Sequence, residues 1–83
     1  MIHFVTQKTA LADCIPWLQP NDRVVLFGDC VASASLVFDQ CQMNVVVAAF
    51  HDDAERFGSD SITRIDGATL VDWLETSPCR TWS

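Results

Sequence analysis

The sequence predicts a single α/β domain, residues 1–83, with a doubly wound, mostly parallel sheet of four to five strands and helices on both faces. Three observations predict this class. Short apolar runs rich in β-branched residues alternate with helix-like segments, the connections between them are short, and there is no linker, repeat or low-complexity stretch. A chain of 83 residues has room for one thin core.

Four apolar runs predict the strands. The second run is continuous, as expected for a strand that is covered on both faces. The third is the most hydrophobic segment of the chain, and the fourth is weaker with a polar flank, which favours a place near the sheet edge. The predicted strands are residues 2–6, 23–27, 44–50 and 61–65.

The segment after the first strand predicts a helix over residues 9–15, with Thr9 as its cap. Pro16 lacks a backbone donor, so we expect it to kink or shorten this helix. A turn follows at 19–22. The apolar residues at core-facing spacing are Leu11, Ile15 and Leu18.

Three further helices are predicted. Asp29 is a suitable N-cap for a helix over 30–38, and a short helix covers 51–58. The last helix, 66–76, ends before Pro78 and leaves a C-terminal tail. Its apolar stripe consists of Leu70, Trp73 and Leu74.

Charge and hydropathy exclude several classes. The formal net charge is −6 and the basic residues form no cluster, so we expect no direct binding of nucleic acid. The first residues lack the features of a signal peptide. The longest apolar run, 45–50, is far shorter than the roughly 20 residues that cross a bilayer. We expect a cytoplasmic protein without membrane association.

Hydrophobic residues make up 49% of the chain, and charged residues only 19%. This surplus points to a buried subunit interface, with an unusually apolar monomer as the alternative. Trp82 adds to the indication, because a docked tryptophan so near the end of the sequence is more typical of a contact between subunits than of catalysis.

Neither a metal nor a nucleotide cofactor is expected. The cysteines contain no CxxC pair, the two histidines complete no zinc pattern, and cytoplasmic cysteines are usually free thiols. No GxGxxG, GxxxxGK[ST] or GxSxG motif is present. His51 follows the third strand, where doubly wound sheets present functional groups, although a lone histidine is more often structural.

Among the cysteines, Cys30 has the best case for reactivity from local sequence alone. It follows a buried strand and a Gly-Asp turn, at a predicted helix start where the helix dipole favours a thiolate. Asp29 acts against this, and the alternative is a small side chain packed at a tight junction. Local sequence describes Cys14 as a buried helix cysteine, and Cys41 and Cys79 as incidental.

Across nearly the whole chain, the order and spacing of short motifs resemble the TusB/DsrH family, although no single motif is specific. The matching features are an "hxLH"-type start at 1–5, an aspartate-closed turn at Asn21–Asp22, a "DG[VI]xAA"-like segment at 29–34, an "xDLxARG"-like segment at 51–58, a "DYxxFVDL"-like helix at 66–74 and the near-terminal Trp82.

The resemblance implies a DsrE/F/H-like fold and a hetero-hexamer with two copies each of three related subunits. The partners would be TusC- and TusD-like subunits, or DsrF- and DsrE-like ones, together with sulfur carriers such as TusA- and TusE-like proteins. TusBCD-type complexes pass persulfide sulfur towards 2-thiolation of the tRNA wobble uridine, and DsrEFH-type complexes serve dissimilatory sulfur oxidation.

The resemblance also changes which cysteine is the leading candidate for a functional role. The DsrH branch carries a cysteine eight residues before the turn aspartate, and Cys14 stands eight residues before Asp22, so Cys14 becomes the leading sulfur-carrier candidate. The family usually has glycine where Cys30 stands. The chain lacks the catalytic cysteine that sister subunits carry just after the third strand, near Phe50. We therefore expect an accessory sulfur-relay subunit, with a DsrH-type subunit or a stand-alone thiol enzyme using Cys30 as alternatives.

Overall fold

The computed structural model describes residues 1–41, 44–57 and 62–83. The strands are β1 (Ile2–Val5), β2 (Arg23–Leu26), β3 (Val46–Phe50), β4 (Thr63–Ile65) and β5 (Cys79–Trp82). The α-helices are α1 (Lys8–Cys14), α2 (Ala34–Gln40), α3 (His51–Phe57) and α4 (Gly67–Thr76), and two 3₁₀-helices are η1 (Ile15–Trp17) and η2 (Gly28–Ser33).

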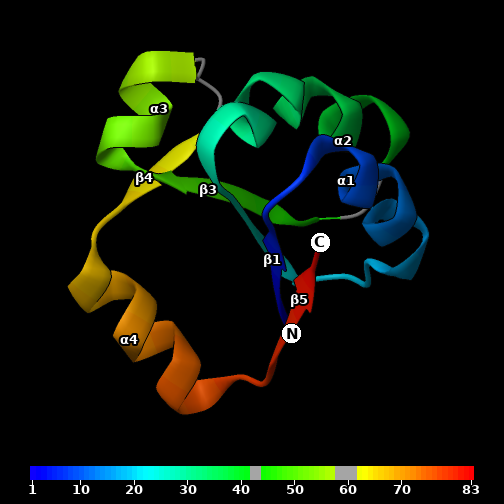
Figure 1. Ribbon diagram of the computed structural model, residues 1–83. Helices are drawn as coiled ribbons and strands as arrows, with labels where there is room; N and C mark the ends of the chain where they lie inside the picture. The colour runs from blue at the N-terminus through cyan, green and yellow to red at the C-terminus, as the bar shows by residue number, and fades with distance from the viewer. Residues whose placement is uncertain (42–43, 58–61) are drawn as a thin grey trace.

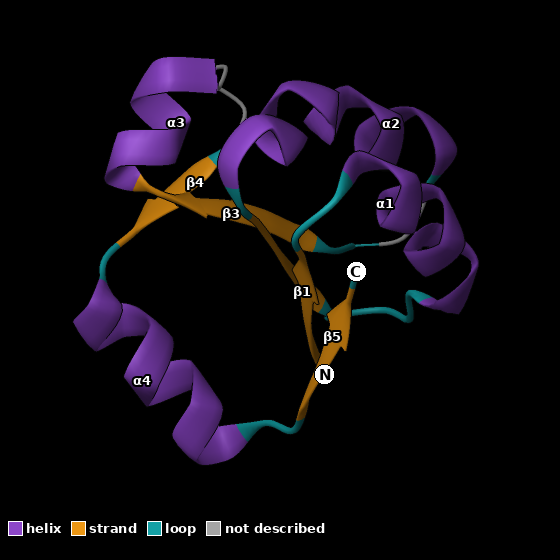
Figure 2. Ribbon diagram, viewed as in Figure 1, coloured by secondary structure: helices purple, strands orange, loops and turns teal. Residues whose placement is uncertain are grey.

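The five strands form one parallel sheet in the order β4-β3-β2-β1-β5. From β1 to β4 the chain always steps in the same direction across the sheet. Since parallel crossovers are right-handed, α1, α2 and α3 all cover one face. The step from β4 to β5 runs the other way, and α4 accordingly lies on the opposite face (Figures 1 and 2). The predicted α/β class with a parallel sheet and helices on both faces is confirmed.

Side chains of successive strand residues point to opposite faces, so the sheet separates two apolar layers. The larger layer lies under α1, η2, α2 and α3 and includes Val5, Leu11, Cys14, Val24, Leu26, Cys30, Val37 and Val47. The smaller layer faces α4 and consists of Ile2, Val25, Ala48 and Ile65 with the partly buried Phe4, Phe27, Val46, Phe50, Leu70 and Trp73.

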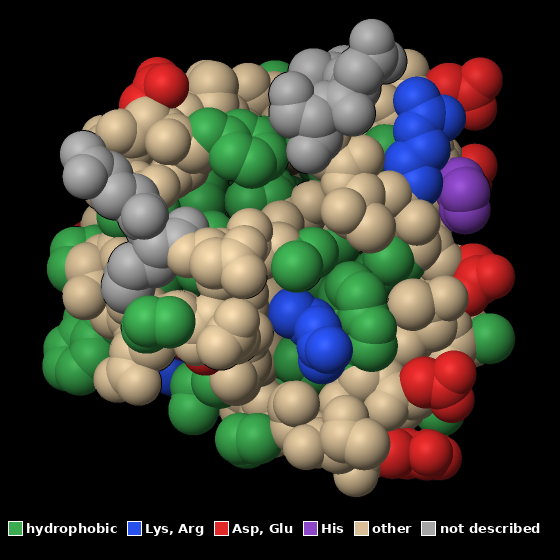
Figure 3. Space-filling view, turned by 180° about the vertical axis from the view of Figure 1, so that it is seen from behind, with side chains coloured by type: hydrophobic (Ala, Val, Ile, Leu, Met, Phe, Trp, Pro, Cys, Tyr) green, Lys and Arg blue, Asp and Glu red, His purple; other side chains and the backbone are tan. Residues whose placement is uncertain are grey.

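One helix covers the second face incompletely. No residue of α4 is fully buried, and Val71 is 54% exposed. Leu70 and Trp73 pack against the sheet as predicted, but Leu74 is 40% exposed, so the predicted apolar stripe is only partly in the core. Figure 3 shows the molecule from behind, where hydrophobic side chains reach the surface in several separate places.

The strand predictions agree with the structure to within one or two residues, and β4 is an edge strand as expected. Two predicted boundaries, the helix end at Gly58 and the strand start at Ser61, lie outside the described residues. Pro16 has the expected effect, because α1 ends at Cys14 and the chain continues as η1. None of the described helices has the length and apolar character needed to cross a bilayer.

Two predicted caps are wrong. Helix α1 begins at Lys8 with Gln7 as its N-cap residue, so Thr9 lies inside the helix. Asp29 lies inside η2, a 3₁₀ segment that replaces the first part of the helix predicted over 30–38. The backbone N–H of Gly28 instead donates to the Asp53 carboxylate, 3.0 Å away on α3. The first N–H of η2 is therefore bonded by a residue distant in sequence, and Asp29 is not a cap residue.

The predicted C-terminal tail is in fact strand β5. It pairs in parallel with β1, in a register that sets Arg80 opposite His3 and Trp82 opposite Val5. Backbone bonds from Ile2 N–H to the Pro78 carbonyl (2.9 Å) and from Thr6 N–H to the Trp82 carbonyl (3.1 Å) hold its two ends. This strand brings the end of the sequence against its beginning (Figure 1).

Candidate functional site

Three residues from distant parts of the chain form a hydrogen-bonded chain at one edge of the sheet. His3 Nε2 lies 2.9 Å from Asp22 Oδ2, and Trp82 Nε1 lies 3.1 Å from His3 Nδ1. His3 comes from β1, Asp22 from the turn that precedes β2, and Trp82 from β5. We call these residues the His3–Asp22–Trp82 cluster. It lies on the sheet face that carries α1, where His3 and Asp22 are both buried.

The bonding pattern fixes the tautomer of His3. An indole N–H can only donate, so His3 Nδ1 must accept, and Nε2 carries the proton that is donated to Asp22. The ring is therefore neutral and both of its nitrogens are engaged. A free ring nitrogen is needed to take a proton from a substrate, so in this arrangement His3 is a structural residue despite its aspartate partner.

Asp22 is the central acceptor of the cluster. Besides His3, its carboxylate accepts from the backbone N–H of Gln19 (3.0 Å) and from the N-terminal ammonium of Met1 (2.9 Å). Burial raises the pKa of the Asp22 carboxyl, but the hydrogen bonds from His3, the terminal ammonium and Gln19 outweigh burial and hold the pKa below its ordinary value. Asp22 is thus a buried carboxylate that its neighbours keep ionised.

A pocket of about 240 Å³ opens beside the cluster and is lined by Met1, His3, Trp17, Gln19, Asp22 and Arg80. The Arg80 guanidinium carbon lies 4.0 Å from the ring centroid of Trp82 and 5.5 Å from that of Trp17. Trp17 is 62% exposed. The rim of the pocket is therefore cationic and aromatic, on a chain whose net charge is negative.

Cys14 lies at the end of α1 and is fully buried. Burial raises the pKa of its thiol to about 11, against the lowering effect of the Arg80 charge and with a further raising effect from Asp22. Both charges belong to the pocket, so Cys14 is electrostatically linked to it. In this conformation the thiol is protonated at neutral pH and shielded from solvent.

Cys30 is also fully buried, within η2. Burial and then the Asp29 charge raise the pKa of its thiol, and these effects exceed the lowering by a backbone hydrogen bond and by Lys8. From the local sequence, we expected the start of a helix to favour the thiolate form of Cys30. The segment is a short 3₁₀ turn packed under α1 and α3, which supplies burial in place of an exposed helix end.

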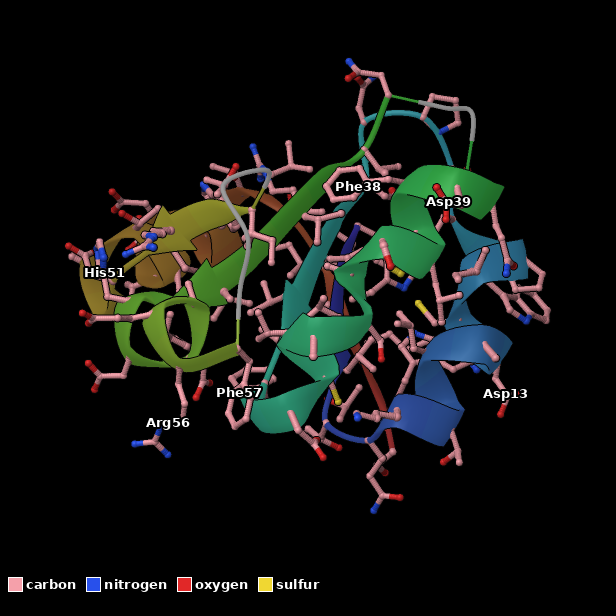
Figure 4. The ribbon with its side chains drawn as sticks, turned by 90° about the horizontal axis from the view of Figure 1, so that it is seen from above. Asp13, Phe38, Asp39, His51, Arg56 and Phe57 are labelled. Atoms are coloured by element: carbon pink, nitrogen blue, oxygen red, sulfur yellow. The ribbon has the colours of Figure 1, made fainter. Side chains whose placement is uncertain are left out.

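The other candidate positions lie apart from the cluster. Cys79 is exposed on β5 and Cys41 is half-buried after α2. His51 is exposed at the carboxyl end of β3, beside a second, shallow pocket, and its side chain projects from the start of α3 (Figure 4). In the part of the chain that the structure describes, no three His, Cys, Asp or Glu side chains gather in a way that could hold a metal ion.

Sequence reasoning missed Asp22 and Arg80 as members of one site. Asp22 was assigned only to a turn, and Arg80 to a tail without structure. The parallel pairing of β5 with β1 brings Arg80, Trp82 and His3 together. No local sequence pattern predicts this pairing. The predicted interface residue Trp82 is half-buried and docked within its own chain.

Comparisons with known proteins give no match. No protein-family model matches the sequence, and neither the curated proteins nor the solved structures contain a match.

The lowered pKa of Asp22 predicts the direction of an acid dependence. Because the folded pKa lies below the unfolded value of about 3.9, the carboxylate stabilises the fold fully above that value and loses this effect as the pH falls through the folded pKa. We expect the loss of unfolding free energy in Asp22→Asn to be largest near neutral pH and to shrink below about pH 4, where the native carboxyl also becomes uncharged. Urea unfolding of both chains across this range measures it, and a loss that stays constant with pH would contradict the assignment.

Proposed function

We propose that this protein is an accessory subunit of a TusBCD-like sulfur-relay complex that passes persulfide sulfur towards 2-thiolation of the tRNA wobble uridine. Cys14 would take up sulfur transiently. The proposal includes a DsrE/F/H-like fold, a cytoplasmic location, and TusC- and TusD-like partners in a hetero-hexamer, with TusA- and TusE-like carriers before and after it. The tRNA would be bound by another component, since the chain has no basic cluster.

One observation carries the proposal. The resemblance rests on motifs scattered along the chain, and three of their residues, His3, Asp22 and Trp82, meet in a single hydrogen-bonded cluster. His3 and Trp82 are 79 positions apart. The cysteine that the resemblance selects, Cys14, lies in the core layer against which Trp82 packs. The meeting of these residues in one cluster supports a common functional role for them, because the sequence around each one does not require that they meet.

The chemistry asked of Cys14 is a thiol–persulfide exchange. The Cys14 thiolate attacks the outer sulfur of a donor persulfide, a new S–S bond forms on Cys14, the donor's S–S bond breaks and the donor cysteine leaves as a thiolate. Electrons balance within this exchange, so no external oxidant is needed. A thiol with a pKa of about 11 is a poor nucleophile at neutral pH, which supports a supporting role over that of the principal carrier.

A DsrH-type subunit in dissimilatory sulfur oxidation is the second candidate, and the position of Cys14 favours it slightly over the first, because the DsrH branch carries a cysteine at this place. Neighbouring genes separate the two, because dissimilatory sulfite reductase genes would accompany a DsrH-type subunit. The third candidate, a stand-alone thiol enzyme using Cys30, needs an accessible thiolate, whereas Cys30 is buried with a raised pKa.

Sulfur loading tests the proposal. We expect a persulfide-charged TusA-like carrier to transfer sulfur to the chain, with peptide mass mapping finding the added sulfur atom on Cys14 first. Cys14→Ser should lose this loading, whereas Cys30→Ser, which removes an equally buried thiol, should keep it. Equal loading of Cys14→Ser and the unaltered chain would contradict the role of Cys14.

A further inference from the structure

Cys14 has no route to solvent in the folded chain, yet a sulfur carrier must meet its donor. The thiol is 0% exposed, and α1, which carries it, packs against β1 and β5. Trp82 of β5 packs against the core layer that contains Cys14, and the charge of Arg80 acts on the thiol from the same strand. Strand β5 therefore forms part of the cover over Cys14.

This cover is held more weakly than the three inner strands, which pair with a neighbour on both sides. Strand β5 is an edge strand and pairs only with β1 among the described strands. Cys79, Arg80 and Thr81 are exposed, so only Trp82 places substantial apolar surface against the fold. The side-chain anchor is the bond from Trp82 Nε1 to His3 Nδ1, supplemented by the bond from Thr6 Oγ1 to the Trp82 carbonyl (3.3 Å). The Arg80 guanidinium adds a longer contact with the exposed Trp17 ring on η1, at 5.5 Å. Segments with few buried apolar contacts open locally at low free energy.

Cys30 provides an internal comparison. It is buried to the same extent, but in η2, which packs against α1, α2 and α3. Opening Cys30 to solvent requires these helices to separate from one another. The two thiols should therefore respond to different motions, one confined to the terminal strand and the other to the helical layer.

We propose that β5 is a removable cover that gates Cys14: when Cys79–Trp82 separates from β1, the thiol reaches solvent while the rest of the fold stays intact. The Trp82–His3 bond acts as the latch. As a control on sulfur uptake, this inference rests on the proposed function. The exposure of Cys14 by movement of β5 does not itself depend on that function. Alkylation measures access to the thiol alone, whereas sulfur loading also needs a donor. A chain that fails to load sulfur can therefore be distinguished from one in which β5 does not open.

The test is native-state alkylation with iodoacetamide, followed for each cysteine by mass mapping. A Cys79→Ser background is used, because alkylating an exposed thiol on β5 would itself disturb the strand. In low urea, we expect the labelling rate of Cys14 to be nearly independent of urea, since local opening exposes little surface, while that of Cys30 rises with urea. A Cys14 labelling rate that rises with urea as steeply as that of Cys30 would overturn the gate, because it would mean that Cys14 is reached only by global unfolding.

Variants identify the latch. Trp82→Phe keeps an aromatic ring but loses the indole N–H, and Trp82→Ala loses both. We expect Cys14 labelling to accelerate a few-fold in the first and about tenfold or more in the second, with Cys30 unchanged. Thr81→Ala, an exposed change on the same strand, is the matched control and should leave both rates unchanged. If Trp82→Phe leaves Cys14 labelling unchanged, or Trp82→Ala accelerates Cys14 and Cys30 equally, the proposed latch is wrong.

Discussion

Replacing Asp22 with alanine should lower the free energy of unfolding by roughly 2–4 kcal/mol. Asp22 is only 6% exposed and accepts from His3 Nε2 and Gln19 N–H in addition to the terminal ammonium. Its removal leaves buried donors without an acceptor, which costs more than the bonds themselves contribute. A domain of this size is stable by only about 5–15 kcal/mol, so the loss is a large fraction of the total.

Urea unfolding followed by far-UV circular dichroism measures this change. Asp13→Ala is the matched control, because Asp13 is an exposed aspartate on α1 whose side chain points away from the body of the protein (Figure 4). We expect the control to change stability by less than about 0.5 kcal/mol. A loss in Asp22→Ala no larger than in Asp13→Ala would contradict the central place of Asp22 in the cluster.

The sheet could be predicted from the sequence because its strands are defined by burial. The runs 24–27 and 45–50 are apolar throughout, and the structure covers β2 and β3 on both faces. A strand buried on both faces needs apolar residues at successive positions, so the pattern and the environment coincide. The same reasoning located the edge strand β4, in which Thr63 and Arg64 are exposed.

The starts of α1 and η2 could not be predicted, because helix caps depend on three-dimensional neighbours as well as on local sequence. Asp29 was expected to be a cap but lies inside η2, and the first N–H of η2, on Gly28, donates to Asp53 on α3. Gly28 has a φ of +58°, in the region that glycine adopts readily, and this turns the chain into η2. Asp66, before α4, caps as local rules expect, by accepting from the Thr69 N–H at 2.8 Å.

The candidate site was the least predictable part. Strand β5 is short and has polar residues among its four, so nothing local distinguishes it from a tail. Its pairing with β1 is what joins Trp82 to His3 and carries Arg80 to the pocket. The resemblance marked His3, Asp22 and Trp82 as parts of separate motifs, and their contact emerges only in the fold.

The second large expected effect is association with the proposed partner subunits, which we expect to be all-or-none. The chain is 49% hydrophobic, α4 has no fully buried residue, and Val71 and Trp17 are more than half exposed. A small domain can leave apolar side chains exposed, and such side chains commonly form the interface with another subunit. We expect Cys14→Ser to assemble like the unaltered chain, since Cys14 is buried within its own core and a lost thiol leaves the surface unchanged.

Native mass spectrometry of the purified chain, mixed with the TusC- and TusD-like proteins from the same genome, tests the sulfur-relay assignment most directly. We expect a single assembly that contains all three proteins, with two copies of each. A chain that stays monomeric and associates with neither protein would contradict it.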